Sequence, residues 1–354
     1  MKTGTSKTAL ITGASSGIGR ELARLFAQDG YNLVLVSRGE NTLNELATEL
    51  KSTTDTQKVT VLQKDLSKEK AAQELYNEVK QQGITVDVLV NDAGVGVHGM
   101  FANETDWEQE SAMIHLNTIS LTHLTKLFLK DMVARDEGKI LNLASIVSVM
   151  PSPLMAVYAG TKAYVQNFTQ SLVNELKGTN VTITALMPNA TDTDFFNKAG
   201  AENTRVTEQL DDPVMVARDG YKALMKGEAK VVAGGLVNKS YEVLAHIASE
   251  EALAAMMRKN MEPKDENSKS MSKKTQNQIA MGIGLAVVGL LGFALANSYS
   301  NLNAYEKARY RYKLNRTGKK VKKAVNQTRE TVADTVANAK ATVENALADY
   351  QKAY

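Results

Sequence analysis

The strongest constraint on the fold is a regular alternation, over the front of the chain, of short apolar segments with amphipathic stretches. Each apolar segment has the length and the Val, Ile and Leu content of a buried strand, and the stretches between them repeat with the period of a helix. The predicted strands are Thr8–Thr12, Asn32–Ser37, Val59–Gln63, Val86–Val90, Lys139–Leu143 and Val181–Met187, with Val231–Ala233 as a candidate seventh. Strand and helix in this order predict a doubly wound α/β domain, a parallel sheet with helices on both faces.

The helices of this domain are expected at Gly19–Gln28, Leu43–Lys51, Ala71–Gln82 and Tyr158–Leu176. A further helical pattern follows the last strand and runs through Tyr241–Met261. We therefore expect one folded domain over residues 1–261, although the length of the chain would allow two or three domains.

Composition narrows the chemistry. The chain has no cysteine, which excludes disulfides and thiolate metal sites. Its histidines show no ligand spacing with carboxylates, so we expect no metal site. The first ten residues are polar, and we expect no secretory signal peptide.

The turn after the first predicted strand reads TGASSGIG, residues 12–19. Gly13, Gly17 and Gly19 would let the backbone turn sharply and approach a pyrophosphate at the N-terminus of the next helix. A purely structural turn can have the same composition. The position at the first strand–helix junction of an α/β pattern favours nucleotide binding.

The second predicted strand ends in Ser37-Arg38, where an acidic residue would bind the ribose hydroxyls of NAD. An Arg at this position suits the 2′-phosphate of NADP instead. NADP is therefore favoured over NAD, although Arg is also a routine surface residue.

Tyr158 and Lys162 are one helical turn apart in VYAGTK, so they share a helix face. The pair is either a solvated helix surface or a phenol tuned for proton transfer. A free phenol titrates near pH 10, so a base at neutral pH needs a pKa lowered by roughly three units. A neighbouring ammonium and the positive nicotinamide of an oxidised cofactor both act in that direction.

Several motifs occur together in the order and spacing of the short-chain dehydrogenase/reductase family, which residues 6–260 resemble. They are TGASSGIG, Asn91-Asp92-Ala93-Gly94, Asn117, Ser145 and Tyr158-Ala-Gly-Thr-Lys162. The sequence around GVGVHGMF and TKAYVQNF is most similar to that of the DltE-like bacterial subgroup. The resemblance implies a Rossmann-type fold, a homo-oligomer, and hydride transfer between NADP(H) and a carbonyl or alcohol substrate.

The resemblance also implies a role for each matching residue. Ser145 would hydrogen-bond the substrate, Tyr158 would be the general acid/base that also contacts the substrate, and Lys162 would bind the nicotinamide ribose and lower the phenol pKa. Asn117 would support a water-linked proton relay to Lys162. The implied cofactor-binding residues are Gly13, Ser15, Ser16, Gly17, Ile18, Gly19, Arg38, Asp65, Leu66, Asn91, Ala93, Gly94, Tyr158, Lys162, Pro188, Thr191 and Thr193.

Two residues depart from the family pattern. Asp92 replaces the second Asn of Asn-Asn-Ala-Gly, a change expected to do little because Asn91 is retained. Asn189 replaces the Gly that follows Pro188. Asn tolerates left-handed backbone angles better than most residues, so the loop is expected to survive.

Apolar side chains flank the catalytic positions and predict an apolar substrate if they line the pocket. They are Met150, Pro153, Leu154, Met155, Phe195 and Phe196.

The C-terminal part of the chain has a different character. Residues 262–278 are polar and are expected to form a linker. Ile279–Ala296 has no charge in 18 residues, and a helix of that length comes close to the roughly 30 Å of a bilayer core. We expect a transmembrane helix here; a buried helix and an interfacial helix are the alternatives. Lys307–Lys323 then holds nine basic residues and no acidic one.

Charge separates the tail from the domain. Residues 297–354 carry 12 basic and 5 acidic residues, whereas the rest of the chain carries 30 and 34. We expect the basic tail, amphipathic towards its end, to lie at lipid headgroups. No nucleic-acid-binding module is recognisable, so no nucleic-acid partner is expected.

The expected location is a cell membrane with the catalytic domain on the cytoplasmic side, or the cytoplasm if the tail is not an anchor. The competing hypothesis for function is a membrane-associated scaffold that binds nucleotide without turnover. Ser145, Tyr158 and Lys162 argue against it, and Asn189 is the one residue in its favour.

Overall fold

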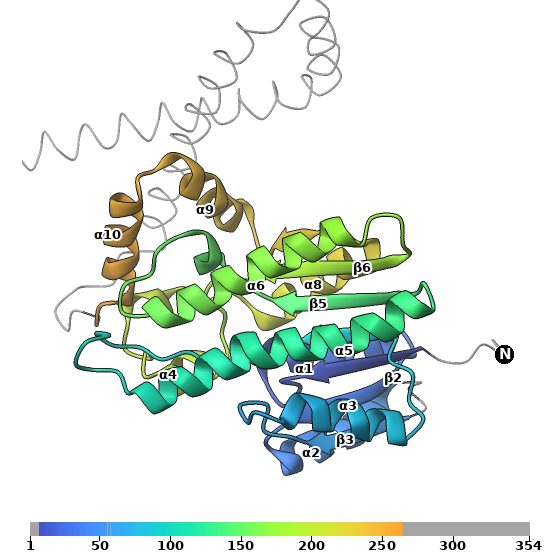
Figure 1. Ribbon diagram of the computed structural model, residues 1–354. Coiled ribbons are helices and arrows are strands. Elements are labelled where there is room, and N and C mark those ends of the chain that lie inside the picture. The colour runs from blue at the N-terminus through green and yellow to red at the C-terminus, as the bar shows by residue number, and fades with distance from the viewer. Residues whose placement is uncertain (1–6, 55, 57, 265–354) are drawn as a thin grey trace, which may run out of the picture. The chain divides into compact units, whose positions relative to one another are not determined.

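The computed structural model of the chain describes residues 7–54, 56 and 58–264 (Figure 1). These belong to one unit that spans Met1–Ser268. Most of the predicted linker, the apolar segment 279–296 and the tail 297–354 lie outside the described residues. Within the described part, no helix is both long and apolar enough to cross a membrane.

Seven parallel strands form one sheet in the order β3-β2-β1-β4-β5-β6-β7. The strands are β1 (Thr8–Thr12), β2 (Asn32–Ser37), β3 (Val59–Gln63), β4 (Val88–Asn91), β5 (Gly138–Leu143), β6 (Val181–Met187) and β7 (Lys230–Val232). The doubly wound Rossmann-type prediction is confirmed, and the seventh strand exists. β4 starts two residues later than predicted and the seventh strand one residue earlier.

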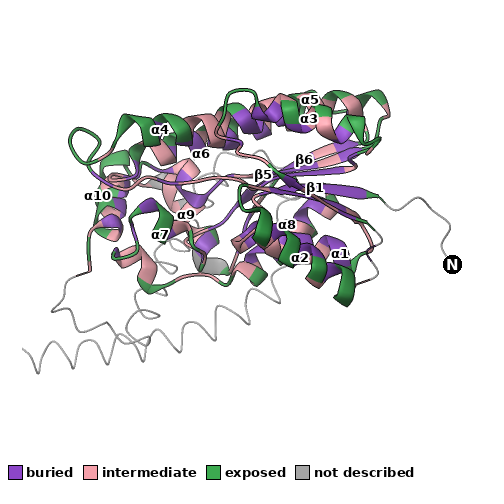
Figure 2. Ribbon diagram, turned by 90° about the horizontal axis from the view of Figure 1, so that it is seen from below, coloured by how far each residue is buried: buried purple, intermediate pink, exposed green. Residues whose placement is uncertain are grey.

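Helices cover both faces of the sheet. Figure 2 shows α3, α4, α5 and α6 on one side and α1, α2 and α8 on the other. The helices are α1 (Gly17–Gln28), α2 (Glu40–Thr53), α3 (Ala71–Gln81), α4 (Trp107–Ile114), α5 (Leu121–Ala134), α6 (Ala156–Glu175), α7 (Phe195–Ala199), α8 (Pro213–Lys226), α9 (Leu236–Ile247) and α10 (Glu250–Met261). A π-helical segment, η1 (His115–Ser120), joins α4 to α5, and short 3₁₀ turns lie at Ile146–Val149 (η2) and Arg205–Glu208 (η3).

The predicted helical run Tyr241–Met261 is divided into α9 and α10. Ser249 has extended backbone angles, and its side chain accepts a hydrogen bond from the backbone N–H of Ala252. Glu250 and Glu251 follow in the first turn, where acidic side chains favour a helix start. The helical run is therefore interrupted at the extended residues Ala248 and Ser249, and α10 begins after its N-cap Ser249.

Apolar side chains fill both sides of the sheet. Phe26 and Leu43 are fully buried under α1 and α2, and Leu75 and Phe128 are buried under α3 and α5 on the other side. The strands between the two edge strands β3 and β7 are largely buried on both faces, as parallel strands usually are. This burial explains why near-continuous apolar runs located them.

A chain of buried polar side chains crosses the middle of this apolar interior. The Asn91 amide donates to Thr125 Oγ1 of α5 at 3.0 Å and to Asn142 Oδ1 of β5 at 2.9 Å. The Asn142 amide donates in turn to Thr169 Oγ1 of α6 at 3.0 Å. The chain of bonds therefore connects β4 and β5 to the helices that pack on them, α5 and α6.

Replacing the central amide should destabilise the fold. Asn142→Ala leaves the Asn91 amide and the Thr169 hydroxyl with lost partners in the interior, so the free energy of unfolding should fall by about 2–4 kcal/mol. Urea denaturation measures the change. Gln73→Ala, which removes an exposed bond to Asn77 on α3, is the control and should stay within about 0.5 kcal/mol of the parent. Equal losses of unfolding free energy in the two variants would contradict a structural role for these buried hydrogen bonds.

Candidate active site

The site lies where the sheet changes its direction of growth. β1 and β4 are neighbours, and the chain leaves β1 for α1 on one face and β4 for α4 and α5 on the other (Figure 2). The loops after these strands therefore diverge at the carboxyl ends, where doubly wound sheets bind ligands.

The glycine-rich turn after β1 has no room for side chains at its glycines. Gly13 and Gly17 have φ angles of +72° and +56°. A Cβ on Gly13 would lie 2.8 Å from Asp92 Oδ2, and one on Gly17 would lie 2.9 Å from Cγ2 of Thr193. Ser16 is the N-cap of α1, and its side chain makes no capping hydrogen bond. The backbone N–H groups of the first turn therefore fit an anion such as a pyrophosphate.

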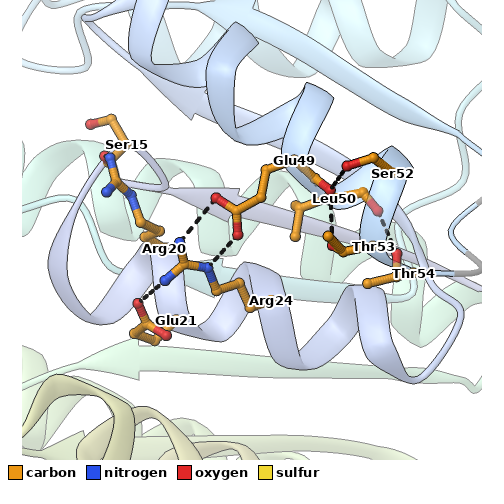
Figure 3. Close-up of polar contacts among 9 residues, drawn as sticks. All are labelled: Ser15, Arg20, Glu21, Arg24, Glu49, Leu50, Ser52, Thr53 and Thr54. Carbon is orange, nitrogen blue, oxygen red and sulfur yellow. Dashed lines mark hydrogen bonds and ion pairs between the residues drawn. The ribbon is translucent and has the colours of Figure 1, made fainter.

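Two arginines of α1 fix the turn (Figure 3). Arg20 points back and donates to the carbonyl of Ser15. Arg24 donates to Glu49 of α2 through Nε at 2.8 Å and Nη2 at 3.0 Å, and it also pairs with Glu21. The turn is thus tied to α1, and α1 is tied to α2 by a bidentate ion pair.

A hydrogen-bonded junction connects the loops after β1 and β4. Thr12 Oγ1 accepts from the backbone N–H groups of Asp92 and Ala93, each at 3.1 Å, and donates to Val90 O at 3.2 Å. Asn91 next to this junction is buried, and its Oδ1 has no hydrogen-bond partner. The predicted residues of the two loops are therefore held side by side.

Asn117 lies in the π-helical segment η1, which interrupts the regular helix. Its amide donates to Val95 O at 2.9 Å and to Thr161 Oγ1 at 3.1 Å, while its Oδ1 accepts from Val95 N–H at 3.1 Å. Single π-helical turns often mark functional positions. Here the turn places a buried amide between the loop after β4 and α6.

Lys162 is buried within α6, on the same side as Tyr158. Its Nζ donates to Leu143 O at 2.8 Å and lies 5.8 Å from the centroid of the Tyr158 ring. A Cβ on Gly94 would lie 3.4 Å from this Nζ. Burial lowers the pKa of Lys162 to about 8, and the charge of Asp92 acts against the shift. Lys162 is therefore enclosed by protein and Tyr158 is half-buried, so the pair is not a solvated helix face.

Tyr158 and Ser145 meet across the carboxyl end of β5. Burial raises the pKa of the Tyr158 phenol well above its ordinary value, and the hydrogen bond with Ser145 acts in the opposite direction. The Ser145 hydroxyl also lies 3.5 Å from Pro188 O. In the protein alone the pKa of the phenol is thus raised, because loss of hydration outweighs the hydrogen bond with Ser145.

Aromatic and aliphatic side chains surround the phenol. The Phe195 ring lies 5.1 Å from the Tyr158 ring, centroid to centroid. A Cβ on Gly96 would lie 2.6 Å from Phe195 Cζ and 2.9 Å from Met155 Cε. The other predicted apolar residues are close by: Met150 and Phe196 are buried in the same apolar cluster, Leu154 packs against it, and Pro153 is half-buried.

The residues expected at the adenine end follow β2 and β3. Arg38 is exposed. Leu66 is buried, and its carbonyl accepts from the Ser120 hydroxyl. Burial acts to raise the pKa of Asp65, but hydrogen bonds from Ser67 and the positive charge of Arg38 bring it below its ordinary value. Arg38 and Asp65 therefore lie close enough to interact.

The loop after β6 is fixed by an unforeseen network. The Asn189 amide donates to Asn238 Oδ1 at 3.1 Å, and the Asn238 amide donates to Asp211 at 2.6 Å. Thr191 forms an isolated parallel bridge with Asp211, and Pro188 O accepts from Ile146 N–H at 2.9 Å. The loop is held at both ends.

This network corrects the explanation expected for Asn189. The only described residues other than glycine with a positive φ are Asp136 and Leu154. Asn189 thus needs no left-handed backbone, and its side chain has a structural use of its own.

Sequence reasoning missed three supporting residues. Thr161 could have been found, because it lies three positions after Tyr158 on the same helix. Thr12 and Asn238 could not, because their partners are 80 and 49 residues away in the chain.

Comparisons with known proteins agree with this geometry. The family model for short chain dehydrogenases matches residues 7–204. Sulfoacetaldehyde reductase 2 of Chromohalobacter salexigens is 37% identical over 191 residues, which cover 54% of this chain and 75% of that protein. Human 17-beta-hydroxysteroid dehydrogenase type 3 is 36% identical over 190 residues, 52% of this chain and 59% of that protein.

The match to a fungal relative, the very-long-chain 3-oxoacyl-CoA reductase of Mycosarcoma maydis, spans only about half of each protein, at 36% identity over 182 residues. Among solved structures, a short-chain dehydrogenase from Sphingobium yanoikuyae in complex with NADPH is 31% identical. The alignment has a TM-score of 0.60 and covers 64% of this chain and 87% of that one. An alcohol dehydrogenase from Thermococcus sibiricus, complexed with 5-hydroxy-NADP, has a TM-score of 0.56 at 28% identity, covering 64% and 96%.

The family match covers more than half of the chain and includes the glycine-rich turn, Asn117, Ser145, Tyr158 and Lys162. With a seven-stranded parallel sheet that brings these residues together, the chain belongs to the short-chain dehydrogenase family.

Proposed function

We propose that the protein is an NADP(H)-dependent oxidoreductase that acts on a carbonyl or alcohol group of an apolar small molecule. The observation that carries the proposal is the grouping of Tyr158, Ser145 and Lys162 beside a glycine-rich turn that fits a pyrophosphate. The similarity to a protein named sulfoacetaldehyde reductase and to an alcohol dehydrogenase complexed with 5-hydroxy-NADP supports it.

The residues present fit a dinucleotide. The first-turn N–H groups of α1 other than that of Gly19, which donates to Asp92, would bind the pyrophosphate, Arg38 the 2′-phosphate, and Lys162 the nicotinamide ribose. Asn91 adds a buried carbonyl oxygen without a partner next to the turn. When bound, the reduced nicotinamide supplies the hydride.

Tyr158 would act as the proton donor in carbonyl reduction. A phenol whose pKa is raised by burial is protonated at neutral pH, so its hydroxyl can donate to a carbonyl oxygen. Ser145, hydrogen-bonded to the same phenol, would orient that oxygen. Lys162, with Asn117 close to it, would return a proton to the phenolate. In the oxidative direction the positive nicotinamide would lower the phenol pKa, as the sequence argument requires.

The substrate class follows from the surroundings of the phenol. Phe195, Met155 and Gly96 offer no charge to a substrate beside Tyr158. An apolar ketone or aldehyde is therefore favoured over a charged one. The sequences of two segments, GVGVHGMF and TKAYVQNF, resemble the DltE-like bacterial subgroup, and we propose that the protein belongs to it.

Removing the phenol hydroxyl should separate chemistry from binding. Tyr158→Phe keeps the ring contact with Phe195 and loses the proton donor, so turnover should fall at least roughly a hundredfold. The Kd for NADPH, measured by fluorescence titration, should change less than about threefold. Near-normal turnover on a substrate that the parent reduces would remove Tyr158 from this role.

Arg38 should decide between the two cofactors. A charge-assisted contact with the 2′-phosphate contributes about 1.5–3 kcal/mol, so Arg38→Ala should weaken NADPH binding by more than about tenfold and leave NADH nearly unchanged. Lys58→Ala, which changes an exposed cation at the opposite end of these parallel strands, is the control. Equal losses for NADPH and NADH would mean that Arg38 does not bind the phosphate.

The alternative is a nucleotide-binding scaffold without turnover. Its one supporting feature was Asn189, and the hydrogen bond from Asn189 to Asn238 gives that residue a structural explanation. We therefore favour the enzyme.

We also propose a homo-oligomer. Ile119 of η1 and Tyr164 of α6 are exposed, 51% and 43%. A hydrogen bond between Thr122 and Tyr164 joins α6 to α5, the helix that follows η1. A second copy of the chain could cover this apolar surface.

The remaining proposal concerns location. Residues 279–296 are proposed to anchor the protein in a cell membrane, with the enzyme on the cytoplasmic side, on the sequence argument alone. An alkaline carbonate wash of membranes tests it: the full chain should stay in the pellet, and a chain ending at Ser268 should be soluble. The cut is placed there because Pro263 and Lys264 pair with Thr204 and Asn203. If both wash off, the segment is not an integral anchor.

A further inference from the structure

Asp92 places a carboxyl group inside the glycine-rich turn. Its Oδ2 lies 2.8 Å from the position of a Cβ on Gly13 and 2.5 Å from that of a Cβ on Gly19. The same carboxyl accepts a hydrogen bond from the backbone N–H of Gly19. Its Oδ1 is buried and has no hydrogen-bond partner. The departure from the family's Asn therefore introduces an ionisable group where the pyrophosphate is expected.

The groups that favour the charged form of this carboxyl come from two elements. Lys162 of α6 attracts the carboxylate, and the N–H of Gly19 in α1 donates to it. Burial outweighs both and raises the pKa of Asp92 to about 7. Asp92 is thus near the midpoint of its titration in neutral solution, which an Asn at this position could never be.

A dinucleotide at the same helix N-terminus would change this balance. Its pyrophosphate adds negative charge close to a buried carboxyl and displaces water around the turn, and both effects favour the neutral acid. We propose that Asp92 is a proton-binding site of the cofactor cleft, which takes up a proton when NADP(H) binds. The proposal rests on dinucleotide binding at this turn, as proposed above.

The sign of the pH dependence follows from linkage. Well below pH 7 the carboxyl is protonated in the free protein, so binding takes up no proton and the affinity is unaffected. Above pH 7 the Asp92 carboxylate of the free protein must take up a proton before NADP(H) can bind. The affinity for NADP(H) therefore falls as the pH rises, by up to about tenfold per pH unit. An amide at position 92 removes this dependence and keeps an acceptor for the Gly19 N–H.

Infrared difference spectroscopy of the full chain, with NADPH minus without at pH 8, tests the uptake directly. The parent should gain the C=O stretch of a protonated carboxylic acid. Asp92→Asn should lack that band and still bind NADPH. Asp131→Asn, a carboxyl-to-amide change at an ion pair with Lys80 on α3, is the matched control and should keep the band.

The Kd for NADPH, titrated at pH 6 and pH 8, gives an independent readout. The parent should lose up to about tenfold more affinity over this range than Asp92→Asn. Ionisation of the 2′-phosphate affects both proteins equally and cancels in the comparison. Saturable NADPH binding with no acid band, or with equal pH dependence in the two proteins, would overturn the inference and leave the proposed function intact. Absence of NADPH binding to the parent would overturn both.

Discussion

The position of every proposed catalytic group depends on the buried hydrogen-bonded chain Thr125–Asn91–Asn142–Thr169. It connects β4 and β5 to α5 and α6, and all four side chains are buried. A buried amide without a hydrogen-bond partner costs free energy, so these hydrogen bonds favour one arrangement of β4, β5, α5 and α6. That arrangement brings Asn117 of η1, the segment that precedes α5, within hydrogen-bond distance of Thr161 of α6.

Burial then decides the electrostatics of the site. Tyr158, Lys162 and Asp92 all have pKa values shifted towards their neutral forms by loss of hydration. A site in this condition favours neutral side chains, and charged partners such as a pyrophosphate and a nicotinamide would shift its protonation strongly. In the protein alone the phenol of Tyr158 therefore favours its protonated form, which agrees with the proton-donor role proposed for it.

The sequence predicted the sheet well because parallel strands are buried on both faces and appear as uninterrupted apolar runs. It also located Tyr158 and Lys162, since one helical turn separates them. It could not find the π-helical segment around Asn117, which has no sequence signal, or the break at Ser249, where capping chemistry overrides helical periodicity. The network from Asn189 to Asn238 and the burial of Asp92 depend on tertiary contacts between distant parts of the chain.

Transfer of a labelled hydride tests the central claim most directly. The full chain would be incubated with NADPH deuterated at C4 of the nicotinamide and a panel of apolar ketones and aldehydes, and the alcohols analysed by mass spectrometry. We expect deuterium at the carbinol carbon of at least one apolar product, with little transfer from equally labelled NADH. Saturable NADPH binding without labelled product from any carbonyl in the panel would contradict it and favour a nucleotide-binding scaffold.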